Sequence, residues 1–143
     1  MHRVERSVLV PYPPAQMFDL IADVPGYPRF LPWCSAARLQ ALGEAAVEAT
    51  IEIAYRGVRS RFTTRNQLDR PQRIGMVLVD GPFQRLDGTW SFAALGDTGC
   101  RANLLLEYEF IAGPLGLAIR PVFDALAGSL IDAFVREADA RHG

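Results

Sequence analysis

Few side chains in this sequence of 143 residues have the type and spacing that acid-base or nucleophilic catalysis requires. The only histidines, His2 and His142, stand at the chain ends, where a catalytic geometry is difficult to maintain. The sequence also contains no HExxH motif, phosphate-binding loop or dinucleotide-binding glycine pattern. We therefore expect no catalytic residue, no metal site and no resident cofactor.

The two cysteines add little chemistry to this picture. Cys34 and Cys100 match neither a CxxC motif nor the spacing of zinc ligands. We expect both side chains to be free thiols rather than a disulfide or a metal site.

The charge of the chain is nearly balanced, with 15 basic residues, 16 acidic residues and a formal net charge of -1. The chain has no excess of basic residues that would indicate a nucleic-acid partner, and we expect no DNA binding. Arg59, Arg61 and Arg65 nonetheless share one side of a predicted strand. A solvated outer face is the simpler interpretation of this arginine cluster. Contact with anionic lipid headgroups or ribosomal RNA phosphates is the alternative.

The segment VPGYPRFLPWC, residues 24–34, is unusually apolar and rich in proline. It carries Tyr27, Phe30 and Trp33 among three prolines and is too short for a proper helix. Because proline restricts the unfolded chain, this segment can order its aromatic side chains at low entropic cost.

Alternating apolar and polar residues predict a series of strands around these features. The stretch VEATIEIAYR, residues 47–56, alternates without exception, and RVERSVLV, residues 3–10, has its valines on one side. Similar patterns continue to residue 110, with a hairpin turn at GDTG, residues 96–99. We expect one strand near the N-terminus and about six antiparallel strands later in the chain.

Two regions have helical periodicity instead. PAQMFDLIADV, residues 14–24, places a proline at a favourable first helical position. The last thirty residues space their apolar side chains as one long amphipathic helix, which Pro121 either kinks or starts. This order predicts an α+β fold with helices on one face of a curved sheet, and a cavity between them. The length suits one domain.

The sequence contains no obvious targeting or membrane segment. Its first ten residues carry charges and lack a continuous apolar core, unlike a signal peptide. The most apolar tract, residues 114–135, is interrupted by Arg120, Asp124 and Asp132, so we expect no membrane span. We expect a cytoplasmic protein.

Three motifs together resemble one known family. They are YPRFLPWC after the first helix, GPFQRLDGTWSF beginning at Gly81, and LAGSLIDAFVREA in the closing helix. On these motifs the whole chain is similar to the coenzyme Q-binding START-domain family, which includes bacterial ribosome association toxin-like proteins. That family belongs to a superfamily of polyketide cyclases and lipid-transfer proteins.

The resemblance implies a helix-grip fold, in which a curved seven-stranded antiparallel sheet surrounds a long C-terminal helix and a hydrophobic cavity. Two short helices would follow the first strand, and residues 1–143 would form a single START-like domain. The implied ligand is a polyprenyl quinone such as ubiquinone, or a related lipid. Tyr27, Phe30 and Trp33 would then form a gate or membrane contact at one mouth of the cavity. Capping the end of the core is an equally good interpretation.

Alternation along the strands and periodicity along the helix select the side chains that would face this cavity. Ligand pockets are lined mainly by apolar and aromatic side chains, although core packing is the simpler role for any one of them. In addition to the three gate residues, the predicted ligand-binding residues are Ile51, Ile53, Tyr55, Phe62, Trp90, Phe92, Tyr108, Phe110, Phe123, Leu126 and Leu130.

Three functions are compatible with the sequence. We rank first the non-enzymatic binding of a quinone, which the protein would sequester or deliver in support of respiration, with transient contact to the inner membrane. The second function is a ribosome association toxin-like protein that binds a ribosomal subunit through the arginine cluster. The third is a polyketide cyclase or aromatase, for which Tyr55 and Tyr108 are the only inward-facing polar candidates.

Overall fold

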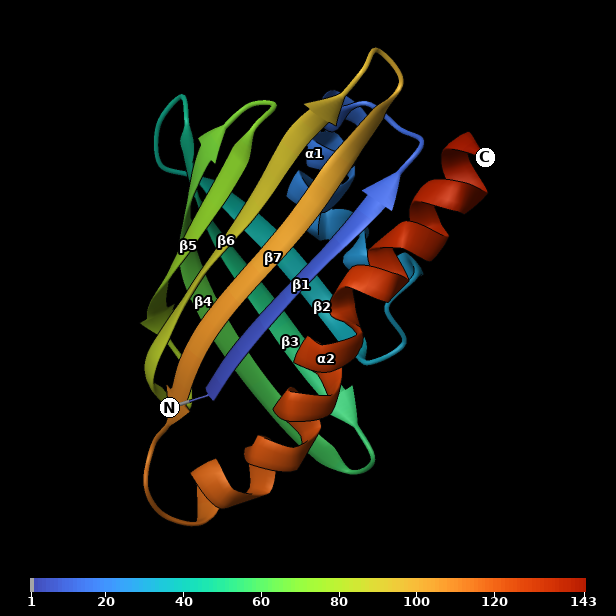
Figure 1. The fold of residues 1–143 in the computed structure, drawn as a ribbon. Helices are drawn as coiled ribbons and strands as arrows, with labels where there is room; N and C mark the ends of the chain where they lie inside the picture. The colour runs from blue at the N-terminus through green and yellow to red at the C-terminus, as the bar shows by residue number, and fades with distance from the viewer. Residues whose placement is uncertain (1) are drawn as a thin grey trace.

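The computed structural model describes residues 2–143 and shows a curved antiparallel sheet that wraps around one long helix (Figure 1). Its seven strands run in the order β1-β7-β6-β5-β4-β3-β2, so the first two strands of the chain form the two edges. This arrangement confirms the predicted α+β helix-grip fold. The strands are β1 (His2–Val10), β2 (Cys34–Ala41), β3 (Ala46–Tyr55), β4 (Val58–Asp69), β5 (Arg73–Asp80), β6 (Phe83–Leu95) and β7 (Gly99–Phe110).

Two short helices connect the edge strands β1 and β2. Helix α1 (Pro14–Ala22) begins with the predicted proline and buries Met17 and Phe18 against the sheet. The proline-rich segment then forms the 3-10 helix η1 (Val24–Arg29). The backbone amide of Ala54 donates a hydrogen bond of 2.9 Å to the carbonyl oxygen of Trp33, so strand β3 holds the end of this segment. Both short helices were predicted.

Helix α2 (Pro114–His142) is the long C-terminal helix and packs against β1, β7 and β4 (Figure 1). It runs through Pro121 and does not start there, although Pro121 cannot donate a backbone hydrogen bond to the preceding turn. By length and composition α2 is apolar enough to cross a membrane, with a mean hydropathy of 1.3 over 18 residues. Core helices share this property, and Ile119, Val122 and Leu126 of α2 are buried at helical spacing.

Glycines serve two different purposes around the sheet. The two-residue turn between β3 and β4 has positive φ at Arg56 (50°) and Gly57 (80°), as the tight hairpin turn requires. Gly88 lies within β6 and not in a turn. A Cβ atom there would come within 2.6 Å of the Leu106 side chain, so Gly88 allows close packing inside the sheet.

Aromatic side chains fill both ends of the concave space. At one end Phe83, Phe110 and Phe123 pack against one another with ring centroids at most 6.0 Å apart. At the other end Phe18 of α1 meets Phe92 of β6 at 6.1 Å. The two ends of the concave space are thus closed by aromatic packing.

Candidate functional site

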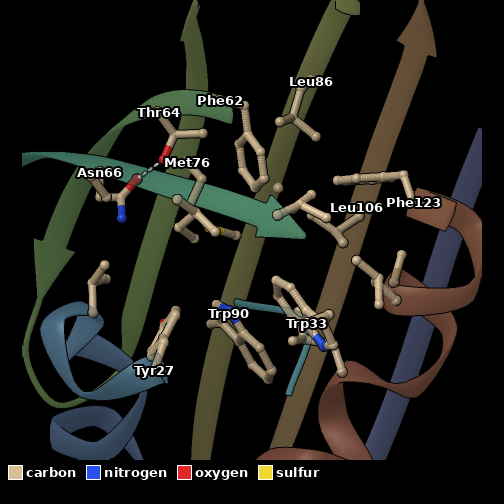
Figure 2. A pocket seen from close by; sticks show the side chains of 18 of the residues that line it. Tyr27, Trp33, Phe62, Thr64, Asn66, Met76, Leu86, Trp90, Leu106 and Phe123 are labelled. Carbon is tan, nitrogen blue, oxygen red and sulfur yellow. Dashed lines mark hydrogen bonds between the residues drawn. The ribbon is translucent and has the colours of Figure 1, made fainter. Parts of the chain in front are cut away.

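A cavity of about 90 Å³ lies between the concave face of the sheet and helix α2 (Figure 2). Nineteen residues line it, and none of these nineteen carries a formal charge. An apolar lining with few polar groups is typical of sites for small hydrophobic molecules. The lining residues are Val24, Tyr27, Trp33, Ala49, Ile51, Ile53, Phe62, Thr64, Asn66, Met76, Leu86, Gly88, Trp90, Leu106, Phe123, Leu126, Ala127, Leu130 and Phe134.

Strand alternation brings the sheet residues to the cavity. On β3 every second residue from Ala49 to Ile53 points inward, and on β4 the inward positions include Phe62, Thr64 and Asn66. Helix α2 closes the opposite side. Its lining residues Phe123, Ala127 and Leu130 follow one another at intervals of about one helical turn.

Thr64 and Asn66 form a polar pair on the wall of the cavity (Figure 2). The Thr64 hydroxyl donates a hydrogen bond of 2.7 Å to Oδ1 of Asn66, and each residue is only 6% exposed. Neither residue was predicted from the sequence, because only apolar and aromatic side chains were expected at the inward positions. Their alternation with Phe62 was the signal that could have identified them.

Both tryptophans of the chain, Trp33 and Trp90, line the cavity. Trp90 is 2% exposed and packs edge-on against Phe134 of α2, with ring centroids 5.5 Å apart. Trp33 is only half-buried, although it packs against the core. Trp33 therefore connects the cavity with the surface.

Tyr27 belongs to the core as well as to the cavity wall. Its ring packs on Phe30 and Phe134, and its hydroxyl donates a hydrogen bond to the carbonyl oxygen of Ile21. Burial raises the pKa of this phenol far above its ordinary range, so Tyr27 is neutral. Tyr27 thus caps the end of the core. Trp33 is half-buried, as a gate residue at the mouth of the cavity would be.

Nine of the fourteen predicted ligand-binding residues line the cavity. Strand parity and helical spacing selected seven of them, and Tyr27 and Trp33 come from the proline-rich segment; contact of all nine with a ligand stays a prediction. They are Tyr27, Trp33, Ile51, Ile53, Phe62, Trp90, Phe123, Leu126 and Leu130.

The other five predicted residues lie outside the cavity lining: Phe30, Tyr55, Phe92, Tyr108 and Phe110. Phe30 is half-buried, with the Arg141 guanidinium 5.8 Å from its ring centroid. Phe92, Tyr108 and Phe110 pack against other aromatic rings, whereas Tyr55 is the last residue of β3 and has the Arg56 guanidinium 5.1 Å from its ring centroid. Alternation along a strand shows which face a side chain occupies but not how far along the strand the cavity extends. The four strand residues therefore face the concave side and yet lie outside the cavity lining.

Tyr55 and Tyr108 therefore do not supply polar groups to the cavity, contrary to the sequence-based expectation. The Tyr108 hydroxyl instead donates a hydrogen bond of 2.8 Å to Oδ1 of Asp124 on α2. Burial and this carboxylate raise the pKa of Tyr108 well above its ordinary range. The His2 ring of β1 stacks on the Tyr108 ring of β7, with ring centroids 5.3 Å apart. His2 is therefore packed against the neighbouring strand.

The cysteines are free, as predicted, and both are buried. Burial raises the pKa of the Cys34 thiol to about 11 and also raises that of Cys100. Such thiols are poor nucleophiles because the reactive species is the thiolate. Within residues 2–143, no three His, Cys, Asp or Glu side chains gather as a metal site would require.

The arginine cluster lies on the outer face of the sheet. Arg59, Arg61 and Arg65 are all exposed on β4, on the side opposite the cavity. Strand β3 places Glu52 beside Arg61 and Glu48 beside Arg65. Acidic residues thus accompany two of the three arginines, which is typical of a solvated sheet face.

Comparison with known proteins agrees with this architecture. Residues 10–135 match the model of the family described as polyketide cyclase / dehydrase and lipid transport. The chain belongs to this family. Its description includes both enzymes and lipid carriers.

Two relatives and one solved structure illustrate the range of the family. "Ribosome association toxin RatA" of Pseudomonas aeruginosa is 42% identical over 141 residues, which cover 98% of this chain and 97% of that protein. "Coenzyme Q-binding protein coq10, mitochondrial" of Schizosaccharomyces pombe is 27% identical, over 95% of this chain and 86% of the relative. The Zhui aromatase/cyclase of a Streptomyces species superposes with a TM-score of 0.84 at 18% identity, covering 98% of this chain and 94% of its own, and shares the fold.

Proposed function

We propose that this protein binds a hydrophobic small molecule, a polyprenyl quinone, in the cavity between the sheet and α2. It would sequester or deliver the quinone at respiratory membranes without converting it chemically. The observation that carries the proposal is the apolar, uncharged lining of the cavity. The coenzyme Q-binding relative from Schizosaccharomyces pombe supports the choice of a quinone.

The size of the cavity bears on how such a ligand would bind. A cavity of about 150 Å³ holds a benzene molecule, so the 90 Å³ present here is too small for a whole quinone ring with its tail. Ligand entry would therefore widen the space between sheet and helix. The half-buried Trp33 offers a route by which the tail could reach the surface.

Extraction of the natural ligand tests this function. The protein is purified from a quinone-producing host, extracted with organic solvent and analysed by mass spectrometry, with an unrelated protein of similar size as control. We expect a polyprenyl quinone in about stoichiometric amount. Absence of any apolar ligand, together with no saturable binding of added quinone, would contradict the proposal.

A second function, association with a ribosomal subunit, is favoured by the 42% identity to a protein named as a ribosome association toxin. On this alternative the exposed cluster of Arg59, Arg61 and Arg65 would contact RNA phosphates. Binding through phosphates weakens steeply as salt rises, because it releases counterions.

Co-sedimentation with purified ribosomal subunits, at low and at physiological salt, distinguishes this alternative. The triple substitution of Arg59, Arg61 and Arg65 by Ala should abolish binding, whereas Arg136→Ala, on the exposed side of α2, should not. If the triple variant sediments like the wild type, the arginine cluster is not the contact.

Cyclase activity has weaker support from the site. The expected tyrosines lie outside the cavity, and its polar pair, Thr64 and Asn66, consists of groups that do not titrate near neutral pH. Turnover of a polyketide mimic by the purified wild-type protein would overturn the proposal of binding without chemistry.

A further inference from the structure

Two hydrogen-bond donors on the cavity wall, one on Asn66 and one on Trp90, have no protein partner within residues 2–143. Asn66 uses its Oδ1 atom to accept the hydrogen bond of Thr64, which orients the amide. Its nitrogen, Nδ2, has no hydrogen-bond partner within residues 2–143, and Figure 2 shows it turned away from Thr64. Because no fully buried side-chain polar atom of these residues lacks a partner, Nδ2 must keep access to open space.

Trp90 supplies a second donor of the same kind. Its side chain is 2% exposed and lines the cavity, yet its indole nitrogen has no hydrogen-bond partner in the described part of the chain. Because no fully buried side-chain polar atom of the described residues lacks a partner, this nitrogen also keeps access to open space. A ligand acceptor could supply the hydrogen bond that the protein does not.

The remaining lining residues narrow the class of ligand further. The Tyr27 hydroxyl already donates to the Ile21 carbonyl oxygen, and the nineteen lining residues include no Lys, Arg or His. A carboxylate ligand would lose its hydration without gaining a cationic partner. A pure hydrocarbon would leave the two N–H groups unpaired.

We propose that Asn66, oriented by Thr64, and Trp90 select ligands that carry an uncharged oxygen acceptor, as ketones and quinones do. This inference rests on the proposed function, because it specifies the ligand class of the same cavity. Asn66 and Trp90 are binding residues, whereas Thr64 is a positioning residue that presents the amide nitrogen to the ligand.

Three probes of similar size separate the ligand classes. Butyrophenone carries a ketone, butylbenzene lacks an oxygen and 4-phenylbutyrate carries a carboxylate. Each competes against the uncharged fluorophore N-phenyl-1-naphthylamine for the purified full chain, and direct titration calorimetry checks the affinities. The informative quantity is the ratio of ketone to hydrocarbon affinity in each variant, since this ratio cancels the common apolar contacts.

Four variants locate the selectivity. Asn66→Leu and Trp90→Phe remove one donor each, and each should lower the ratio about 3- to 10-fold, as expected for a net hydrogen bond. Thr64→Val frees the amide to rotate, so it should lower the ratio and improve the affinity for 1-phenylbutanol, which carries a hydroxyl donor. Thr50→Val is the matched control, because Thr50 is buried on β3 but faces away from the cavity.

The outcomes distinguish this inference from the proposed function. If butyrophenone and butylbenzene both bind but the ratio is the same in wild type, Asn66→Leu and Trp90→Phe, the inference is wrong and the binding function stands. Equal affinity for 4-phenylbutyrate and butyrophenone at neutral pH would also refute the inference. If the wild type binds neither butyrophenone, butylbenzene nor added ubiquinone, the proposed function itself fails. Thermal melts confirm that each variant is folded.

Discussion

The two tryptophans differ in burial although both line the same cavity. Trp90 is enclosed by Phe92 and Phe134, whereas Trp33 keeps part of its surface in solvent at the end of the proline-rich segment. Tryptophan suits a boundary of this kind because its ring is apolar and its N–H is polar.

Truncation should therefore affect the two tryptophans differently. We expect Trp33→Ala to lower the free energy of unfolding by about 1–2 kcal/mol and to slow quinone transfer from vesicles. Trp90→Ala should cost about 3–5 kcal/mol, as for other buried aromatic residues. Chemical denaturation and a vesicle transfer assay measure the two effects. A large loss of stability in Trp33→Ala with unchanged transfer would favour core capping over a gate.

Cys34 provides a prediction for alkaline pH. Burial raises the pKa of this thiol from 9.0 to about 11, so the unfolded chain releases the proton at lower pH than the folded protein does. The contribution to stability is complete below pH 9 and is lost as pH rises toward 11, by at most about 1.4 kcal/mol per pH unit.

The free energy of unfolding of Cys34→Ala should thus decline less steeply than that of the wild type between pH 9 and pH 11. Urea melts at intervals across this window measure the slopes. Tyr108 and Cys100 have raised pKa values in both proteins. The Cys34 thiolate also contributes to the raised pKa of Tyr27, so the difference in slope reports the ionisation of Cys34 together with its effect on Tyr27. Parallel curves would show that Cys34 ionises equally readily in the folded and unfolded states.

At the scale of elements, the start of α2 is fixed by a close backbone contact. A Cβ atom built on Gly116 would lie 1.9 Å from the carbonyl oxygen of Ile111, in the link that follows β7. Since neither backbone segment can yield easily, only glycine allows the helix to begin so close to the sheet.

Two glycines of α2 offer a matched pair of substitutions. Gly116→Ala should destabilise the protein by about 2 kcal/mol or more, because the helix start must move. Gly128→Ala meets no atom within 4 Å and should stabilise it by up to about 1 kcal/mol through helix propensity. Thermal and urea denaturation provide the comparison. Equal effects of the two substitutions would mean that the contact with Ile111 is not limiting.

At the scale of the whole molecule, the cavity is the space that two aromatic clusters leave unfilled. Along β6, the cavity is lined by Leu86, Gly88 and Trp90, whereas Phe83 before them and Phe92 after them pack into the ends. Binding and stability are consequently separable, because filling the middle need not disturb either end.

Ala127→Leu should fill the cavity from the α2 side and abolish ligand binding. We expect the free energy of unfolding to change by less than about 2 kcal/mol, since gained apolar contact offsets local crowding. Ala125→Leu, on the exposed side of the same helix, serves as control and should leave binding unchanged. Quinone titration and thermal melts measure both. Wild-type affinity in a folded Ala127→Leu protein would place the ligand elsewhere.

Much of the architecture was predictable from sequence patterns. The alternation of residues 47–55 identified the inward face of β3, and the spacing of Val122, Phe123 and Leu126 identified the buried face of α2. These local periodicities arise from the backbone geometry of strands and helices, so they require no knowledge of the neighbouring elements. The family motifs implied the helix-grip arrangement that the structure then confirmed.

Only the tertiary structure decided how far along each strand the cavity extends. Phe92 and Trp90 share a face of β6, yet α1 covers Phe92 while Trp90 borders open space. Position along the strand also explains why Tyr108, which faces the concave side, lies outside the cavity lining, whereas Asn66 lies in it. Sequence periodicity determines which face of an element is buried, whereas sheet curvature, strand register and the position of α2 determine where packing leaves a gap.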